Sequence, residues 1–142
     1  MLKIVLDTNI LVAGLRSSIG ASAELLRQAR YGNLVLAATP PLFLEYEEVL
    51  KRAEHLLASG LTVAQVDVFL GALAQIIHPV DLNFRWRPQL SDPDDEMFME
   101  AAVNGRVDAL ITFNSKHFLA AAAMFGLELW SPRELLRRMR ND

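Results

Sequence analysis

Short apolar runs alternate along the chain with longer segments of helical periodicity. The runs largely lack the in-and-out alternation of a strand with one solvated face, and strands buried on both faces are typical of parallel sheets. They cover Leu2–Leu6, Leu34–Ala38, roughly Ile76–Val80, Ala109–Phe113 and Leu127–Trp130. The pattern therefore predicts a parallel sheet of about five strands.

Between these runs, apolar residues recur at the spacing of an amphipathic helix. The predicted helices cover about Ser22–Tyr31, Pro40–Leu57, Thr62–Ile77, Pro93–Asn104 and Pro132–Arg140. Capping side chains precede a proline at Thr39, Asp92 and Ser131, the arrangement that starts many helices, and Thr62 is a further predicted cap. Strands that alternate with helices predict an α/β domain whose sheet is covered on both faces.

Length and composition limit the kind of protein this is. The 142 residues fit a single domain, 1–142. The absence of cysteine excludes a disulfide scaffold, a thiolate zinc site and a cysteine nucleophile. No apolar run approaches the roughly 18–20 residues that cross a bilayer, and Asp7 interrupts the first run before a signal-peptide core forms. We therefore expect a cytoplasmic protein without a membrane segment.

Asp7 directly follows the first predicted strand. Ligands of open α/β sheets bind beyond the carboxyl ends of the strands, which makes this the expected position of a functional acid. The alternative is that Asp7 caps a following helix, with Thr8 and Asn9 as turn formers.

Glu45 falls within the apolar stripe of the Pro40 helix. A carboxylate on the core-facing side of a helix is costly unless it is paired or bound to a cation. The alternative is a glutamate at the edge of the stripe whose carboxylate reaches water.

Four acids lie within the six residues 91–96. Asp92 suits a helix N-cap, and one or two acids in a first turn complement the helix dipole. The excess indicates a nearby cation. Asp95 shares a helix face with three apolar residues, which directs it inward, and Asp94 is the second choice.

Polar residues also follow the fourth predicted strand, from Thr112 to Lys116, and point to the same edge of the sheet. Asn114 and Ser115 are equally ordinary turn formers. The three histidines are scattered, and no serine-hydrolase, dinucleotide-binding or Walker motif is present. Oxygen ligands remain, and these select Mg²⁺ or Mn²⁺ for phosphoryl chemistry.

Together these motifs resemble the PIN domain family. The resembling segments, in order, are IVLDTNILVAGL, PPLFLEYEEVLKR, DPDDEMFMEAAVNGRVDALITFNSKHF and LELWSPRELL, which span nearly the whole chain. The resemblance is closest to the VapC-like ribonucleases, the toxins of toxin–antitoxin pairs. It implies a three-layer α/β/α domain with strand order 3-2-1-4-5.

The resemblance also implies roles for single residues. The family's metal-binding acids carry over to Asp7, Glu45 and Asp95, and a further family aspartate is replaced here by Asn114. Asparagine offers a neutral oxygen without charge. The residues expected to supplement the metal site, or to position water or phosphate, are Asp92, Asp94, Thr8 and Thr112.

The expected function is a Mg²⁺- or Mn²⁺-dependent endoribonuclease, with RNA as substrate, a cognate antitoxin as partner and a homodimer as assembly. One alternative is a non-catalytic PIN-like RNA-binding or scaffold module whose site has decayed at Asn114. Glu45 and the surplus acids argue against decay. A second alternative, a haloacid-dehalogenase-type phosphatase, needs an aspartate where the chain has Asn9.

The net charge of −3 and pI near 5.6 argue against nucleic-acid binding by bulk positive charge. The five candidate acids account for more than this charge, and bound divalent cations reduce it. Arginines gather in the last predicted helix. They either contact phosphates or form a solvated face that suits a helix C-terminus.

Overall fold

A computed structural model describes residues 1–82 and 93–141, with the side chains of the helix that begins at Pro93 described from Asp95 onward. Its strands form one sheet in the order β3-β2-β1-β4-β5, and every neighbouring pair is parallel. The strands are β1 (Lys3–Leu6), β2 (Val35–Ala38), β3 (His78–Pro79), β4 (Ala109–Ile111) and β5 (Glu128–Trp130). The predicted α/β class and strand order are confirmed.

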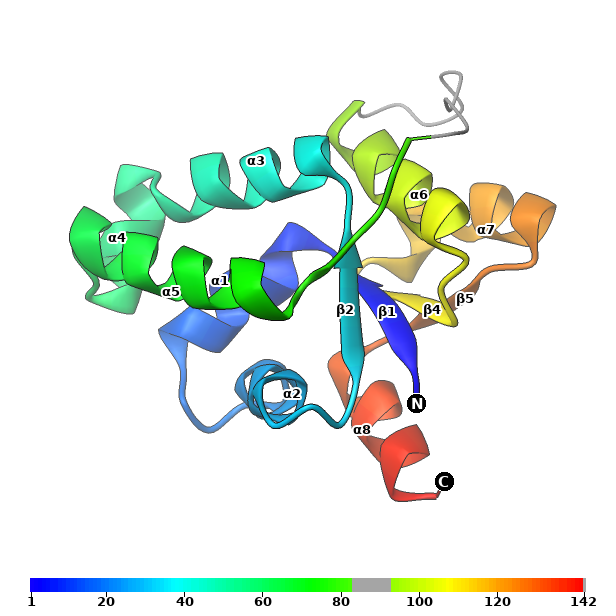
Figure 1. Ribbon diagram of the computed structural model, residues 1–142, viewed down its shortest axis with the longest axis horizontal. Coiled ribbons are helices and arrows are strands. Elements are labelled where there is room, and N and C mark those ends of the chain that lie inside the picture. Colours follow the sequence, from blue (N-terminus) through cyan, green and yellow to red (C-terminus); the bar gives the residue numbers. More distant parts are fainter. Residues whose placement is uncertain (83–92, 142) are drawn as a thin grey trace.

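Helices cover both faces of the sheet (Figure 1). The helices are α1 (Thr8–Arg16), α2 (Ala21–Arg30), α3 (Pro40–Leu50), α4 (Ala53–Ser59), α5 (Val63–Ile76), α6 (Pro93–Gly105), α7 (Leu119–Phe125) and α8 (Pro132–Arg140), with a short 3₁₀ turn η1 (Ser115–His117). On one face α1 packs against α2, and α2 against α8, while α6 and α7 pack on the other. The domain therefore has three layers.

One predicted helix is two helices in the structure. The prediction of a continuous helix over Pro40–Leu57 is wrong, because α3 ends at Leu50 and α4 begins at Ala53. Arg52 between them has an extended backbone, with φ −63° and ψ 141°. At the break, the Lys51 ammonium lies 2.6 Å from the Asp67 carboxylate on α5. Apolar spacing continues across the break, so the pattern alone conceals it.

Two helices of the structure were not predicted. In α1, Ile10, Leu11 and Val12 are successive buried residues, and α7 has the composition LAAAAMF without a charged face. Amphipathic periodicity requires a polar face as well as an apolar one. Helices that lack a polar face therefore do not show the periodicity from which a helix is predicted.

Three predicted helix caps are confirmed. The hydroxyls of Thr39, Thr62 and Ser131 each accept a backbone N–H from the first turn of α3, α5 and α8. The fourth predicted cap, Asp92, lies outside the described residues. In the part of the chain that the structure describes, no single helix is long and apolar enough to cross a membrane.

The core fixes the position of the strand ends. Val5 of β1 and Leu110 of β4 are fully buried and lie in register. Leu11 of α1, Leu25 of α2 and Met99 of α6 belong to the same core. Because all the strands are parallel, their carboxyl ends meet at one edge of the sheet, where the segments after β1 and β4 lie next to each other.

Candidate functional site

Asp7 lies at the carboxyl end of β1 and is 6% exposed. Its backbone N–H donates to the Ile111 carbonyl oxygen at 2.9 Å, which continues the pairing of β1 with β4. Its carboxylate accepts the Asn9 backbone N–H at 3.4 Å as the N-cap of α1. Asp7 is therefore both a helix cap and a buried acid at the ligand-binding edge of the fold.

Thr112, at the carboxyl end of β4, lies against this acid. Its hydroxyl donates to Asp7 Oδ2 at 2.8 Å and accepts the Asn114 backbone N–H at 3.0 Å. Thr112 is buried, whereas Asn114 is exposed. The structure thus brings the side chains of Asp7 and Thr112 together from segments that are distant in sequence, with the backbone of Asn114 beside them.

The surroundings of Asp7 disfavour its charge. Burial raises the pKa of Asp7, and this effect exceeds the lowering caused by the Thr112 hydrogen bond, the Asn9 backbone N–H and the charge of His117. Among the described residues, no cationic side chain forms an ion pair with Asp7. A cation at this edge would offset the cost of the buried carboxylate.

The hydroxyl of Thr8 is a second buried polar group at this edge whose cost of burial no described residue offsets. Thr8 is 5% exposed, and its Oγ1 atom has no hydrogen-bond partner among the described residues. A buried polar atom without a partner is costly. A ligand or water that accepts or donates a hydrogen bond here would remove that cost.

Asp95 is brought to the same edge by packing between α6 and the segment after β4. Phe98 of α6 meets Phe118 edge to face, with ring centroids 6.3 Å apart. One helical turn before Phe98, the Asp95 carboxylate Oδ2 lies 3.6 Å from Nδ1 of His117. Asp95 is partly buried, at 19% side-chain exposure, as its inward position on the helix predicted.

His117 was missed at the level of the sequence. It is close to Asp95 and lies near enough to Asp7 for its charge to lower the pKa of that acid. Its spacing from the other histidines carries no signal. Its position three residues after Asn114, beyond the same strand end, is the signal that marks it.

Glu45 lies on α3, the helix that is hydrogen-bonded to the end of β1. The next residue, Tyr46, is buried, and its hydroxyl donates to the Leu6 carbonyl oxygen. Burial, followed by the charge of Asp7, raises the pKa of Tyr46. Glu45 itself is partly buried, and its charge contributes to the raised pKa of Arg52 after the larger effect of Glu48.

The predicted ligand set is not seen as a closed metal site. In the described part of the chain, no three His, Asp or Glu side chains form a group that could hold a metal ion. Convergence of Glu45 with Asp7 and Asp95 therefore stays a prediction. Asp92 lies outside the described residues, as does the side chain of Asp94.

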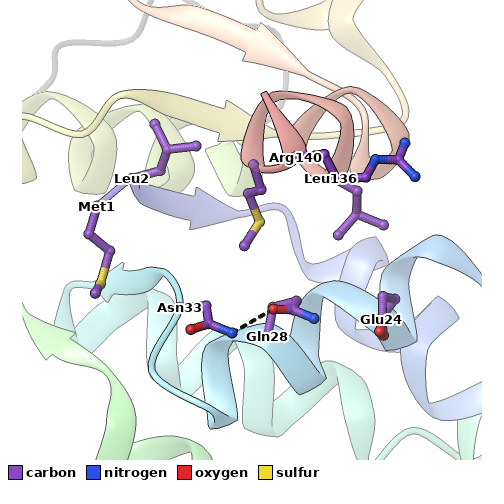
Figure 2. Close-up of a pocket in the computed structure, with 8 residues that line it drawn as sticks. Met1, Leu2, Glu24, Gln28, Asn33, Leu136 and Arg140 are labelled. Carbon is purple, nitrogen blue, oxygen red and sulfur yellow. Dashed lines mark hydrogen bonds between the residues drawn. The ribbon is translucent and has the colours of Figure 1, made fainter. Parts of the chain in front are cut away.

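A surface groove of about 580 Å³ lies at the opposite edge of the sheet (Figure 2). It lies between the start of the chain, α2 and α8, and its lining includes Met1, Gln28, Asn33 and Arg140. Gln28 and Asn33 hydrogen-bond to each other at 2.8 Å. This groove is remote from the buried acid, because Met1 precedes β1 and Asp7 follows it.

Comparison with known proteins agrees with the fold and with the order of the motifs. No curated protein matches the chain. Residues 3–116 match the PIN domain, a range that contains β1, the Glu45 helix, Asp95 and the loop beyond β4. A match over well over half of the chain shows that it belongs to the PIN domain family, a family of nucleases whose members generally bind divalent metal ions.

Proposed function

We propose that this protein is a Mg²⁺- or Mn²⁺-dependent endoribonuclease that hydrolyses RNA phosphodiester bonds. The observation that carries the proposal is the Asp7 carboxylate, buried at the carboxyl edge of the sheet with a raised pKa and no ion-pair partner among the described residues. Such a group is destabilising by itself, and a divalent cation offsets its cost.

The residues present suit a divalent cation. The donors at this edge include the Asp7 and Asp95 carboxylates and the unpartnered Thr8 hydroxyl, and hard oxygen donors are the ligands that Mg²⁺ and Mn²⁺ prefer. Asp7, Glu45 and Asp95 would hold the ion, with Asp94 or Asp92 adding charge. When bound, the ion polarises a phosphoryl group and activates water.

The neighbouring polar residues have separate roles. Thr112 holds the orientation of the Asp7 carboxylate through the hydrogen bond at 2.8 Å. Thr8 and Asn114 would position water or a phosphate oxygen, because one has an unpartnered hydroxyl and the other an exposed amide.

The finer assignment is a VapC-like toxin that acts in the cytoplasm as a homodimer and is held inactive by a cognate antitoxin. Its support is the resemblance of the four motifs to that branch of the family. A neighbouring gene for a small DNA-binding protein that co-purifies with this chain and blocks its activity would support the assignment. A gene without such a neighbour would favour a nuclease outside toxin–antitoxin pairs.

A non-catalytic RNA-binding or scaffold module is the second candidate function. It is favoured by Asn114, which is exposed and brings no charge to the position where the family often has an aspartate. The two candidates differ in one respect that is easily measured, namely metal-dependent cleavage.

The test is cleavage of single-stranded RNA by the purified protein with millimolar Mn²⁺ or Mg²⁺. We expect cleavage that stops with a chelator and falls at least about a hundredfold in Asp95→Asn, since removing one preorganised electrostatic group commonly costs about 10²–10³ in rate. Asp108→Asn is the matched control, because Asp108 is an exposed acid that precedes β4 at the other edge of the sheet. RNA binding without cleavage would instead support the non-catalytic module.

A further inference from the structure

His117 lies beside Asp95, and its charge also lowers the pKa of Asp7. Its backbone N–H donates to the Asn114 carbonyl oxygen at 3.1 Å, which fixes η1 directly beyond the end of β4. Its side chain is 62% exposed, and Nδ1 lies 3.6 Å from Asp95 Oδ2. The imidazole is therefore accessible and next to a carboxylate that the proposed function assigns to the metal.

The separation of these two atoms is that of an ion pair when His117 is protonated, and it is also compatible with two ligands of one ion when the imidazole is neutral. A nitrogen–oxygen distance of 3.6 Å is beyond hydrogen-bonding range. Metal–oxygen and metal–imidazole bonds of about 2.1 Å place two ligands of one ion about 3.0–4.2 Å apart, depending on the angle between them. The observed distance falls within that interval.

The positions of both residues are set by packing that does not involve a metal. Phe98 follows Asp95 by one helical turn, Phe118 follows His117 directly, and the two rings are in edge-to-face contact. Phe98 and Phe118 are almost completely buried. This contact holds α6 against the segment after β4, so the carboxylate and the imidazole are placed beside each other before any ion binds.

We propose that His117 is a nitrogen ligand of the divalent cation, beside Asp95, and that it shifts the preference of the site from Mg²⁺ toward Mn²⁺. Imidazole is a ligand that transition metals accept, whereas Mg²⁺ favours oxygen. The inference rests on the proposed function. It also explains how a site with neutral Asn114 gains a ligand from the same loop, three residues farther along.

The test is metal binding, measured separately from RNA cleavage. Pulsed electron paramagnetic resonance of bound Mn²⁺ detects a directly coordinated ¹⁴N nucleus, and calorimetry gives the Kd for Mn²⁺ and for Mg²⁺. In the wild type we expect nitrogen modulation, which His117→Ala removes. The Kd for Mn²⁺ should rise at least about tenfold, because even groups that only orient a ligand commonly change metal affinity by about 10–100-fold, and the Kd for Mg²⁺ should change much less.

Two further variants make the result specific. His117→Asp replaces nitrogen by oxygen, so it should bind without ¹⁴N modulation and prefer Mg²⁺ more than the wild type does. His78→Ala is the matched control, because His78 is an exposed histidine on β3 and its removal should leave the nitrogen signal intact.

The outcomes separate this inference from the proposed function. Mn²⁺ that binds the wild type without nitrogen modulation, with unchanged affinity in His117→Ala, overturns the role of His117 and leaves the nuclease intact. Loss of the signal in His78→Ala overturns it as well. A folded wild type that binds neither ion at millimolar concentration overturns the metal-dependent nuclease itself.

Discussion

Carboxylates at the two edges of the sheet differ in their exposure and in the groups that contact them. At the amino-terminal edge, Asp108 is exposed and accepts the Lys3 backbone N–H at 2.8 Å. Glu24, which lines the groove there, pairs with Arg27 at 3.1 Å. At the carboxyl edge, Asp7 is buried and its hydrogen bonds come from neutral donors, the Thr112 hydroxyl and the backbone N–H groups of Asn9 and Thr8.

This difference shows where the fold carries an unfavourable charge. Exposed acids are solvated, and their ion pairs contribute little to stability. A buried carboxylate without a cation favours the protonated form, so its pKa rises, as it does for Asp7. The groove at the amino-terminal edge is a sizeable hollow. The buried charge of Asp7, however, makes the carboxyl edge the one that a bound cation would stabilise most.

Asp7→Asn tests the difference between the two edges most directly. Among the variants that compare the edges, we expect it to have the largest effect. Cleavage should fall about a hundredfold or more. Metal-free stability should equal or exceed that of the wild type at neutral pH, because asparagine also caps helices and does not bring a buried charge. Cleavage assays and urea denaturation without metal measure both properties.

The pH dependence of stability follows from the raised pKa of Asp7. The folded state binds the proton more tightly than the unfolded chain, so the wild-type free energy of unfolding falls as pH rises from about 3.9 through the folded pKa. Each unit of difference is worth about 1.4 kcal/mol. The advantage of Asp7→Asn should therefore vanish in acid. A variant that is clearly less stable at neutral pH would show that capping by the carboxylate dominates.

Tyr46→Phe should have the next largest effect. The Tyr46 hydroxyl is buried and donates to the Leu6 carbonyl oxygen beside Asp7, so its removal should cost about 1–2 kcal/mol of unfolding free energy. Tyr31→Phe is the matched control, because Tyr31 is 69% exposed. Chemical denaturation compares the two, and equal losses would show that the bond to β1 contributes nothing measurable.

Asp108→Asn should have the smallest effect. The amide oxygen of the new side chain would still accept the Lys3 N–H, so we expect a loss below about 0.5 kcal/mol, as at most exposed positions, and unchanged RNA cleavage. Denaturation and cleavage assays check this. A large loss of activity would contradict the assignment of function to the carboxyl edge alone.

The sequence predicted the layered fold because buried parallel strands and capped amphipathic helices leave strong patterns. It did less well where the local pattern was incomplete. The fourth strand ends at Ile111 and not at Phe113, and the third covers only His78–Pro79 of the predicted run, with Ile76 belonging to α5 and Ile77 to its C-cap. The break between α3 and α4 lies where the backbone of Arg52 is extended, next to the contact of Lys51 with Asp67 of α5, and helical spacing encodes neither feature.

The candidate site was predicted where a residue follows a strand and missed where its role depends on packing. Asp7 and Thr112 were identifiable because each directly follows an apolar run, and the structure joins them. His117 is placed beside Asp95 by the contact of two phenylalanines. No spacing rule in a single sequence reports such a contact.

The pairing of β1 with β4 has a consequence for the order of folding. Asp7 and Thr112 are 105 positions apart, and β1, the central strand, is synthesised before the other strands of this sheet. Contacts between distant segments form slowly, because a long loop must close before they are made. A growing chain on the ribosome therefore lacks this edge of the sheet until β4 has emerged. Any activity that depends on the Asp7–Thr112 pair therefore requires synthesis of the chain at least through β4.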